Sequence, residues 1–273
     1  MPVKYILYNP DSGVKTGRSA AEALKSSCEN AVFINICRIS SYKVFFNGLE
    51  KDAEVILCGG DGTLNRFANE IRDISISNDI FCCPTGIMNT AAESLGRKKG
   101  SPPFCINSLL DRPPSVVING EDRVFLRSIG LGIEGYCCET ANMHMQQSKK
   151  PKPVSYKAIA AVGMLFKAEP VNAEITVDGQ NHSFKNVWLA AVENKGDRLS
   201  LTVLRCSDRV KGLWLLNSVY KDGSGRHPKN ISIFTGSHIS LKADRSAPIH
   251  IDGEVISDVT SFDVKINQER NLL

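Results

Sequence analysis

Two different patterns of apolar and polar positions divide the chain. In the first half, short runs of consecutive apolar residues alternate with segments in which apolar residues recur every three or four positions. The runs predict buried strands, and the periodic segments predict helices. Continuous apolar strands that alternate with helices are typical of a parallel sheet covered on both faces. The predicted strands are residues 3–8, 31–37, 53–58 and 80–83, and the predicted helices are residues 16–28, 41–49 and 63–72.

The pattern changes at residue 115. Beyond it, apolar runs come in pairs joined by short turns, which predicts antiparallel hairpins. We therefore expect an α/β + β protein: a parallel-sheet α/β domain over residues 1–114 and a β-sandwich domain over residues 115–273, whose C-terminal segment could return to the first domain. The predicted pairs are 116–119 with 124–129, 173–177 with 184–192, 229–234 with 238–243, and 249–251 with 262–266, interrupted by helices at 134–147, 155–167 and 208–219.

Composition narrows the class of protein. With 273 residues, 42% of them hydrophobic, the chain can bury two hydrophobic cores. No apolar run approaches the roughly 18 residues of a membrane-spanning helix, and the N-terminus enters a strand without a signal peptide. Nine cysteines without a C-x-x-C pair predict free, buried thiols in a reducing cytoplasm. The net charge of +4 is too small to indicate a nucleic-acid partner and is compatible with an anionic membrane surface or an anionic substrate.

Residues 58–65, with the sequence Cys-Gly-Gly-Asp-Gly-Thr-Leu-Asn, form the most informative segment. Glycines without a Cβ let backbone N–H groups approach an anion closely, and a helix that begins at Thr63 would add the positive end of its dipole. Asp61 indicates nucleotide chemistry, because a carboxylate beside a phosphate needs an intervening metal ion or a proton to accept. The alternative is a plain Asp-Gly hairpin, but the residues that follow have helical spacing.

Two further polar loops follow predicted strands. Residues 9–13, Asn-Pro-Asp-Ser-Gly, follow the first strand, and residues 84–90, Pro-Thr-Gly-Ile-Met-Asn-Thr, follow the fourth. Each alone could be an ordinary turn or a helix cap. Because ligands of parallel sheets bind outside the carboxyl ends of the strands, the three loops together predict a nucleotide site at one edge of the sheet.

Two segments of the second half have competing interpretations. Residues 130–135 match the dinucleotide fingerprint G-x-G-x-x-G, but a lysine- and proline-rich connector replaces the acidic residue expected about 20 positions later. We therefore expect a tight glycine turn between the domains. The connector, residues 147–153, is predicted to be a solvated linker, and contact of its three lysines with an acidic membrane is the alternative.

Five motifs together resemble a known family. Their order and approximate spacing resemble those of the diacylglycerol kinase catalytic-domain family, specifically the bacterial YegS/BmrU-like lipid kinases. The five motifs are residues 9–13, 59–65, 84–89 and 130–134 and the late Asp252-Gly253-Glu254. The resemblance spans nearly the whole chain. Its Gly-Gly-Asp-Gly-Thr element is specific to a superfamily that also includes NAD kinases, whereas the opening Asn-Pro-x-Ser-Gly and the late Asp-Gly-Glu are features of the lipid kinases.

The resemblance implies a Rossmann-like nucleotide-binding domain over residues 1–114 and a β-sandwich lipid-binding domain over residues 115–273, with the active site in the cleft between them. The protein would be a phosphotransferase of phospholipid metabolism that uses ATP and Mg²⁺. The acceptor would be a hydroxyl group of a diacylglycerol-like or sphingoid lipid, reached at a membrane surface by a cytoplasmic, peripheral protein. Asp61, Asp252 and Glu254 would act in catalysis, with the general base in the late acidic motif. The residues implied to bind the nucleotide are Asn9, Pro10, Asp11, Ser12, Gly13, Arg38, Gly59, Gly60, Asp61, Gly62, Thr63, Asn65, Thr85, Gly86 and Asn89.

The chain departs from the family pattern in its loops. Ile87 and Thr90 stand where the family has a nucleotide-contacting Thr and an Asp. Cys37 or Arg38 stands near the position of a second such Thr, and the Arg38 guanidinium could pair with a phosphate. After Asn194 the family's glycine-rich loop and Asp-Asp-Gly metal motif are missing, which leaves Asp197, one position away, as the candidate metal ligand. Three hypotheses follow: an active lipid kinase, a degenerate member that binds nucleotide or lipid without phosphoryl transfer, and an NAD kinase.

The sequence leaves the acceptor pocket and the assembly open. Met143, Met145, Met164, Leu165 and Phe166 could line a lipid pocket, but their apolar character equally suits core packing, which we expect for each of them. An exposed edge of the predicted sandwich could pair with a second copy in a homodimer.

Overall fold

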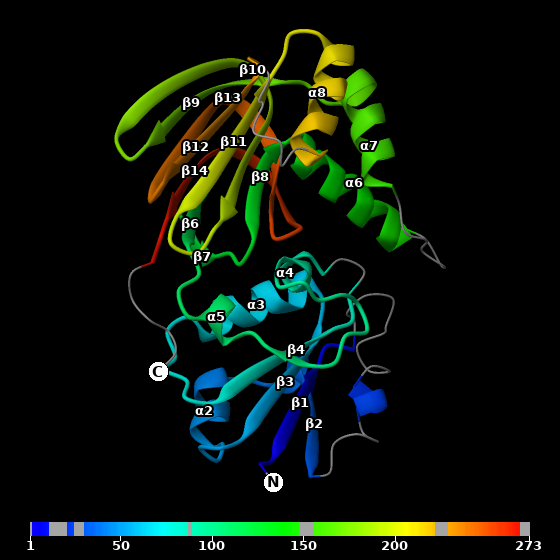
Figure 1. Cartoon of the computed structure of the whole chain (residues 1–273), viewed down its shortest axis with the longest axis vertical. Coiled ribbons are helices and arrows are strands. Elements are labelled where there is room, and N and C mark those ends of the chain that lie inside the picture. The colour runs from blue at the N-terminus through cyan, green and yellow to red at the C-terminus, as the bar shows by residue number, and fades with distance from the viewer. Residues whose placement is uncertain are drawn as a thin grey trace. The chain divides into compact units, whose positions relative to one another are not determined.

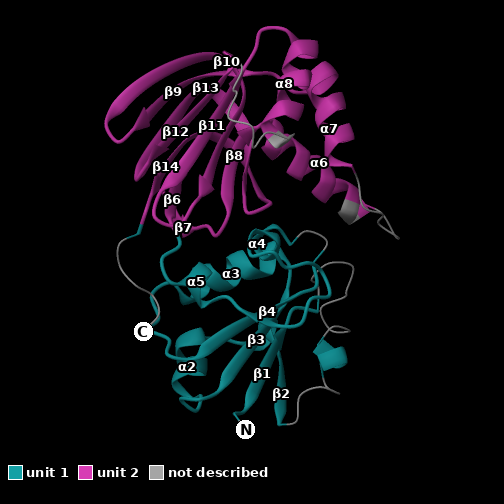
Figure 2. Ribbon diagram, in the orientation of Figure 1, with its two compact units in different colours: residues 1–113, 267–273 teal, residues 114–266 magenta. Residues whose placement is uncertain are grey.

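The computed structural model describes residues 2–10, 21–24, 30–86, 89–147, 155–221 and 229–267. The chain divides into two compact units, Met1–Pro113 with Asn267–Leu273 and Pro114–Ile266 (Figure 2). The return of the chain to unit 1 is visible at Asn267, whose side-chain amide donates a hydrogen bond of 2.7 Å to the carbonyl oxygen of Pro113. None of the helices in the described segments has both the length and the apolar character needed to cross a membrane.

Unit 1 contains a five-stranded sheet with the strand order β2-β1-β3-β4-β5 (Figure 1). The first four strands of the chain run parallel to one another, and β5 is antiparallel to β4 at the edge. The parallel sheet predicted from four apolar runs is therefore confirmed. The strands are β1 (Lys4–Tyr8), β2 (Ala31–Asn35), β3 (Glu54–Gly59), β4 (Asp79–Pro84) and β5 (Phe104–Cys105).

Both faces of the unit 1 sheet are covered. Consecutive residues of a strand point to opposite faces, yet Ile6 and Leu7 in β1 are both fully buried, and so are Ile56 and Leu57 in β3. Ile6 and Ile56 pack in one cluster with Ala21, which lies in the helical residues 21–24. The other helical elements of this unit are η1, a 3-10 turn (Ile36–Arg38), α2 (Tyr42–Asn47), α3 (Asp61–Ile71), α4 (Thr90–Ser94) and α5 (Asn107–Leu110).

Unit 2 is built on a nine-stranded antiparallel sheet, which confirms the β-rich second domain. The strand β9 pairs with the first halves of β10 and β13, whereas β8 pairs with the second halves of the same two strands. The two predicted layers are therefore parts of one continuous sheet that curls around a common core. The strands are β6 (Ser115–Ile118), β7 (Glu121–Val124), β8 (Ser128–Gly132), β9 (Val171–Val177), β10 (Gln180–Asn194), β11 (Leu199–Arg205), β12 (Ile231–Gly236), β13 (His238–Ile251) and β14 (Glu254–Lys265).

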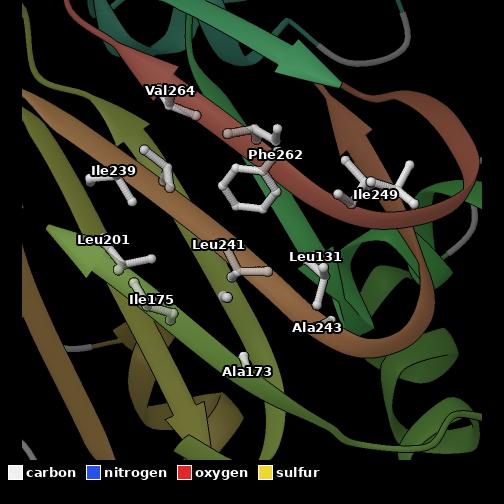
Figure 3. Close-up of a cluster of buried hydrophobic side chains, with 14 of the residues drawn as sticks. Leu131, Ala173, Ile175, Leu201, Ile239, Leu241, Ala243, Ile249, Phe262 and Val264 are labelled. Carbon is white, nitrogen blue, oxygen red and sulfur yellow. The ribbon is translucent and has the colours of Figure 1, made fainter. Parts of the chain in front are cut away.

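Apolar side chains from seven of these strands fill the inside of the curl, and Figure 3 shows part of this cluster. Leu131 of β8, Ile175 of β9, Leu201 of β11, Leu241 of β13 and Phe262 of β14 belong to one buried cluster. Each strand buries alternate residues on this side, as the burial of Val171, Ala173, Ile175 and Val177 along β9 shows. The core of unit 2 is therefore supplied by residues far apart in the sequence.

A layer of helices covers the outer side of β10 and β11 (Figure 1). Trp188 and Leu189 of β10 pack there with Met164, Leu215 and Leu216 of the helices. The predicted core role is confirmed for Met164, whereas Phe166 and Met143 are exposed and the Met145 side chain lies outside the described part of the structure. The layer consists of α6 (Ile133–Gln147), α7 (Tyr156–Val162), the π-helix η2 (Gly163–Lys167) and α8 (Arg209–Lys221).

Three of the predicted strand pairings in unit 2 are wrong in detail. Among the described residues, β12 pairs with β11 and makes no hairpin with β13. Residues 249–251 of β13 pair with 254–256 of β14, whereas residues 262–265 of β14 pair with 238–241 of β13. The predicted strand 124–129 is interrupted between β7 and β8. In each case the apolar runs were found, but their pairing was not: β12 joins the distant β11, whereas the β6–β7 and β13–β14 pairings begin at two-residue turns, with Ile118 opposite Glu121 and Ile251 opposite Glu254.

The glycine-rich residues 130–135 do not form a turn between the domains. Gly130 and Gly132 lie in β8, and Gly135 lies in the first turn of α6, all inside unit 2. A Cβ on Gly132 would collide with the carbonyl oxygen of Trp188, and a Cβ on Gly135 would collide with that of Pro248. The glycines therefore permit close backbone packing between β8, α6 and their neighbours.

The eight described cysteines are free thiols, as predicted, but two of them are exposed. Burial raises the pKa of Cys82, Cys137 and Cys138 to about 12, so these thiols stay protonated and unreactive at neutral pH.

We expect iodoacetamide to alkylate the exposed Cys37 and Cys105 at least tenfold faster than it alkylates the buried Cys82, Cys137 and Cys138, since only the thiolate is nucleophilic. Peptide mass spectrometry of the time course, with urea-unfolded protein as the reference, checks this. Equal rates at Cys105 and Cys137 would contradict it.

Candidate functional site

The predicted loops of unit 1 meet at the carboxyl edge of the parallel strands. Tyr8, the last residue of β1, pairs in register with Asn35 of β2 and with Cys58 of β3. Gly59 of β3 in turn pairs with Pro84 of β4. Chain order reverses between β1 and β3, the point at which ligands of open α/β sheets bind. The loops that follow β1, β2, β3 and β4 therefore surround one position in the sheet.

The glycine-rich loop leads directly into α3, whose first residue is Asp61. A Cβ on Gly59 would collide with the Thr63 side chain, so this glycine allows the tight turn from strand to helix. At Gly62, by contrast, an added Cβ would meet no described atom within 4 Å. The first-turn N–H groups of a helix have no partner within the helix and attract anions. The start of α3 thus presents an uncrowded place for a phosphate group.

Asp61 connects this loop to the loop after β4. Its carboxylate accepts hydrogen bonds from the Thr90 N–H at 2.8 Å, the Thr90 hydroxyl at 2.9 Å and the Ala91 N–H at 3.1 Å. These donors belong to the first turn of α4, so Asp61 caps α4 although it lies 29 residues away. The side chain is buried, with 7% of its surface exposed. Asp61 therefore fixes the relative position of two of the predicted nucleotide loops.

The loop after β4 has a second support in Asn89. Its side chain accepts from the Gly86 N–H at 3.1 Å and donates to the Gly86 carbonyl oxygen at 3.0 Å. The Thr85 N–H donates to the carbonyl oxygen of Gly59 at 3.0 Å, which ties this loop to the glycine-rich loop. Asn89 and Thr85 are buried and hold the backbone, whereas Asn65, also buried, receives the side-chain amide of Asn69.

The remaining predicted nucleotide residues are placed less completely. Asn9 and Pro10 follow β1 directly, and Asp11, Ser12, Gly13 and Ile87 lie outside the described residues. Arg38 ends the η1 turn that follows β2, and its side chain is exposed on the same edge of the sheet. An exposed guanidinium at this edge can reach a phosphate without a desolvation cost in the free protein.

Asp252 is the second buried acidic residue of the prediction. One carboxylate oxygen accepts from the Leu126 N–H at 2.7 Å, and the other accepts from the N–H groups of Arg127 and Ser128 at 2.8 and 2.9 Å. Its own N–H donates to the Ser128 carbonyl oxygen. With 6% of its surface exposed, Asp252 anchors the segment that enters β8.

Glu254, two residues later, is in a different environment. It is the first residue of β14, its backbone pairs with Ile251, and its side chain is exposed. Asp252 and Gly253 have φ values of 47° and 86° and form the turn between β13 and β14. The motif thus supplies one structural carboxylate and one available carboxylate, and only the second is free to meet a ligand from solution.

A histidine adjoins this turn. His250 is buried, its Nε2 lies 3.3 Å from Glu134 Oε2, and its Nδ1 accepts from the Gly253 N–H at 3.3 Å. Asn142 of α6 donates to the Gly253 carbonyl oxygen at 3.4 Å. A Cβ on Gly130 would collide with the Glu134 carboxylate and the His250 ring, so the glycine makes room for this pair. Glu134 and His250 therefore hold the acidic turn against the start of α6.

The predicted metal ligand Asp197 lies in the turn between β10 and β11. It is exposed, and its carboxylate accepts from the Arg198 guanidinium, which lowers its pKa. Among the described residues, no group of three or more His, Cys, Asp or Glu side chains is placed to hold a metal ion. Because Asp61 and Asp252 are also committed to backbone donors, these side chains do not by themselves make a magnesium site.

Comparison with known proteins gives a family match for the first part of the chain. Residues 4–118 match the model of the diacylglycerol kinase catalytic domain. The match places this segment, the part of the chain that holds the candidate site, in the diacylglycerol kinase catalytic-domain family. Relatives of this chain include a "putative lipid kinase" in each of the Staphylococcus aureus strains MSSA476 and MRSA252, both 23% identical over 79% of this chain and 75% of the relative. The family predicted from the motifs is confirmed.

Solved structures match the fold of nearly the whole chain. The crystal structure of a "putative diacylglycerol kinase" from Bacillus anthracis str. Sterne matches with a TM-score of 0.66 and 17% identity, covering 98% of this chain and 92% of the other. A further diacylglycerol kinase structure from the same organism matches with a TM-score of 0.60 over 98% of this chain. At this identity the likeness establishes the arrangement of elements, and the predicted combination of a parallel sheet with a β-rich domain is confirmed.

Local sequence patterns do not identify two residues beside the acidic turn. Glu134 is part of the glycine motif at residues 130–135, and His250 belongs to no sequence motif. The two residues are separated by 116 positions, so no local spacing indicates their contact. The available signal was the crowding of glycines at positions 130, 132 and 135, which marks close packing around the start of α6.

Proposed function

We propose that this protein is an ATP-dependent lipid kinase that transfers the γ-phosphoryl group to a hydroxyl group of a diacylglycerol-like or sphingoid lipid. The observation that carries the proposal is the arrangement at the ends of β1, β3 and β4, where an open helix N-terminus at Gly62 adjoins two loops joined by Asp61. This arrangement suits a nucleotide polyphosphate. The family and its bacterial lipid-kinase relatives support the reaction type.

In the proposed reaction, the oxygen of the acceptor hydroxyl forms a bond to the γ-phosphorus, and the bond from that phosphorus to the bridging oxygen of ADP breaks. The hydroxyl proton goes to a carboxylate, for which Glu254 is the exposed candidate. Mg²⁺ bound to ATP would neutralise phosphate charge when present. The first turn of α3 and the Arg38 guanidinium would contribute positive potential at the nucleotide phosphates.

Binding without transfer is the second candidate, and a specific observation favours it. Two of the three predicted catalytic carboxylates, Asp61 and Asp252, are occupied by backbone donors and have structural tasks. The test is purified protein with ATP, MgCl₂ and dioctanoylglycerol or sphingosine in mixed micelles, with ADP and phospholipid product both quantified. Formation of phospholipid product supports the proposed lipid kinase. ATP binding in calorimetry without phospholipid product supports a protein that binds nucleotide but does not transfer phosphate. Formation of NADP from NAD would identify an NAD kinase.

Gly62→Ala tests the nucleotide site separately from the fold. An added methyl group meets no described atom at this position, and alanine favours a helix more than glycine by about 1 kcal/mol, so the thermal midpoint should stay constant or rise. The same methyl would occupy the space proposed for a phosphate, and we expect the Kd for ATP to rise at least tenfold in calorimetry. Gly48→Ala, at the C-cap of α2 in an ordinary helical conformation, is the matched control. Unchanged affinity in Gly62→Ala would argue against phosphate binding at α3.

A further inference from the structure

The helical layer of unit 2 exposes large apolar side chains on its outer side. Phe166 of η2 and Trp214 of α8 have 74% and 65% of their surface exposed, and Val162 and Val210 are also exposed. Phe and Trp side chains gain more from burial than almost any others, so two of them in water within one layer are unusual. We call the exposed side chains of Val162, Phe166, Val210 and Trp214, together with the basic residues of α7, η2 and α8, the outer face.

The outer face is formed by residues on the opposite side of each helix from the core. Val162 and Phe166 are four residues apart, and so are Val210 and Trp214, which places each pair on one stripe. Met164 lies between Val162 and Phe166, and Leu215 directly follows Trp214; both are buried in the cluster against β10 and β11. The exposed stripes therefore point away from the sheet.

The two stripes belong to helices that are fixed to each other. Arg209, at the start of α8, donates to the carbonyl oxygens of Met164 and Ala168 at 2.8 and 3.0 Å, at η2 and its end. A Cβ on Gly212 would lie 3.0 Å from the Met164 methyl group, so α8 and η2 approach closely. Because these contacts are made on the inner sides, the exposed residues of both helices form parts of a single rigid layer.

The charge of α7, η2 and α8 is of one sign. These segments carry five basic residues and no acidic residue in their sequences, and the acidic residues of the layer, Glu134 and Glu139, lie in α6. The two acidic residues that border α7, η2 and α8 are engaged: Glu169 pairs with Arg209, and Asp208 accepts from the Lys211 N–H at 2.6 Å. The basic residues whose side chains the structure describes are Lys157, Lys167, Arg209 and Lys211.

We propose that the outer face docks this protein onto an anionic lipid surface. Aromatic side chains bordered by lysines are typical of segments that lie in the membrane interface, where rings enter the headgroup region and amines meet lipid phosphates. A second copy of the chain fits less well, since the core of a protein interface is depleted of lysine and the like charges of two copies would repel. The docking proposal is inferred from the exposed apolar and basic residues of unit 2 and does not depend on phosphoryl transfer. Docking would nevertheless bring the proposed lipid kinase to its acceptor.

Co-sedimentation with sucrose-loaded vesicles tests this, comparing phosphatidylcholine alone with phosphatidylcholine containing about 30 mol% phosphatidylserine. We expect binding to the anionic vesicles and at least a tenfold lower partition coefficient for Phe166→Ser/Trp214→Ser and for Lys167→Glu/Lys211→Glu. The matched controls are Val44→Ser, which removes an equally exposed apolar residue from α2, and Lys98→Glu/Lys99→Glu in unit 1. Unchanged binding of both outer-face variants would overturn the proposal.

Tryptophan fluorescence adds a direct readout, because Trp188 is buried and Trp214 is exposed. Insertion should shift the Trp214 emission to shorter wavelength and allow quenching by brominated lipid, and neither change should occur in Trp214→Ser. A dimer in light scattering that Phe166→Ser/Trp214→Ser dissociates, without vesicle binding, would assign the face to a second copy and overturn the proposal. We expect these variants to phosphorylate monomeric dioctanoylglycerol in solution at the unchanged rate. This assay therefore separates a failure of docking from a failure of the proposed kinase activity.

Discussion

Asp61→Asn is expected to reduce phosphoryl transfer at least a thousandfold and to loosen α4. The carboxylate accepts three hydrogen bonds, two from Thr90 and one from Ala91, on its two oxygens. An asparagine replaces one acceptor oxygen with an NH₂ group, which would face a donor, and removes the negative charge at the start of α4. Leaving buried donors unsatisfied costs about 2 to 3 kcal/mol. Turnover is measured in the mixed-micelle assay, and stability by circular dichroism in urea.

The matched control for Asp61→Asn is Thr90→Val. It removes only the hydroxyl donor at 2.9 Å and leaves the charge and the two N–H donors in place. We expect it to cost about 1 kcal/mol and to keep activity within tenfold of the unchanged protein. If Thr90→Val loses as much activity as Asp61→Asn, Asp61 acts by positioning the loop after β4. Full activity in Asp61→Asn would remove this residue from the mechanism altogether.

The edge of unit 1 at which the candidate loops meet was predictable from local sequence. Glycines, apolar runs and helical spacing are all short-range features, and they correctly placed β1, β3, β4 and α3. The parallel arrangement then follows from the alternation of strands and helices, and it brings the loops to one edge without further information. The proposal of a phosphate site at this edge needed little more than the segment that contains Gly59 and Asp61.

The partners of the acidic residues were not predictable in the same way. Asp252 accepts hydrogen bonds from residues 124 to 126 positions away, and the pairing of β12 with β11 is likewise decided by distant strands. The register of β13 shifts between Lys242 and Ile249, so one long strand meets different neighbours in its two halves. Local spacing identified Asp252-Gly253 as a turn, but it could not show which backbone groups the carboxylate would bind.

The hydrogen bonds of the two buried carboxylates change how the family's acidic motifs are interpreted in this chain. Asp61 and Asp252 each use both carboxylate oxygens to hold a second segment, α4 in unit 1 and the entry to β8 in unit 2. Such residues are sensitive to substitution whether or not they touch a substrate, so loss of activity alone cannot identify the general base. To identify the general base, a carboxylate must be removed without changing the stability of the fold. Glu254 is such a carboxylate, because its side chain is exposed.

Glu254→Gln and Asp252→Asn should therefore have opposite effects. Glu254 is exposed and takes part in β14 through its backbone, so glutamine preserves the fold, and we expect the midpoint in urea to be unchanged while kcat falls about 10² to 10⁴-fold. Asp252→Asn should lower the free energy of unfolding of unit 2 by about 3 kcal/mol, because three backbone N–H groups lose a charged acceptor. Asparagine tolerates the positive φ of 47° at this position, so the loss reports on the carboxylate and not on the turn.

The two Trp residues, Trp188 and Trp214, both lie in unit 2, so their fluorescence in urea follows the unit that contains both substitutions. A Glu254→Gln variant with native stability and native kcat would exclude Glu254 as the base. If Asp252→Asn instead kept native stability and lost turnover, the carboxylate that binds the backbone would be the chemical one. Loss of turnover in Glu254→Gln with an unchanged Kd for ATP is the result that assigns proton transfer to Glu254, because a general base contributes to the transition state and leaves nucleotide binding unaltered.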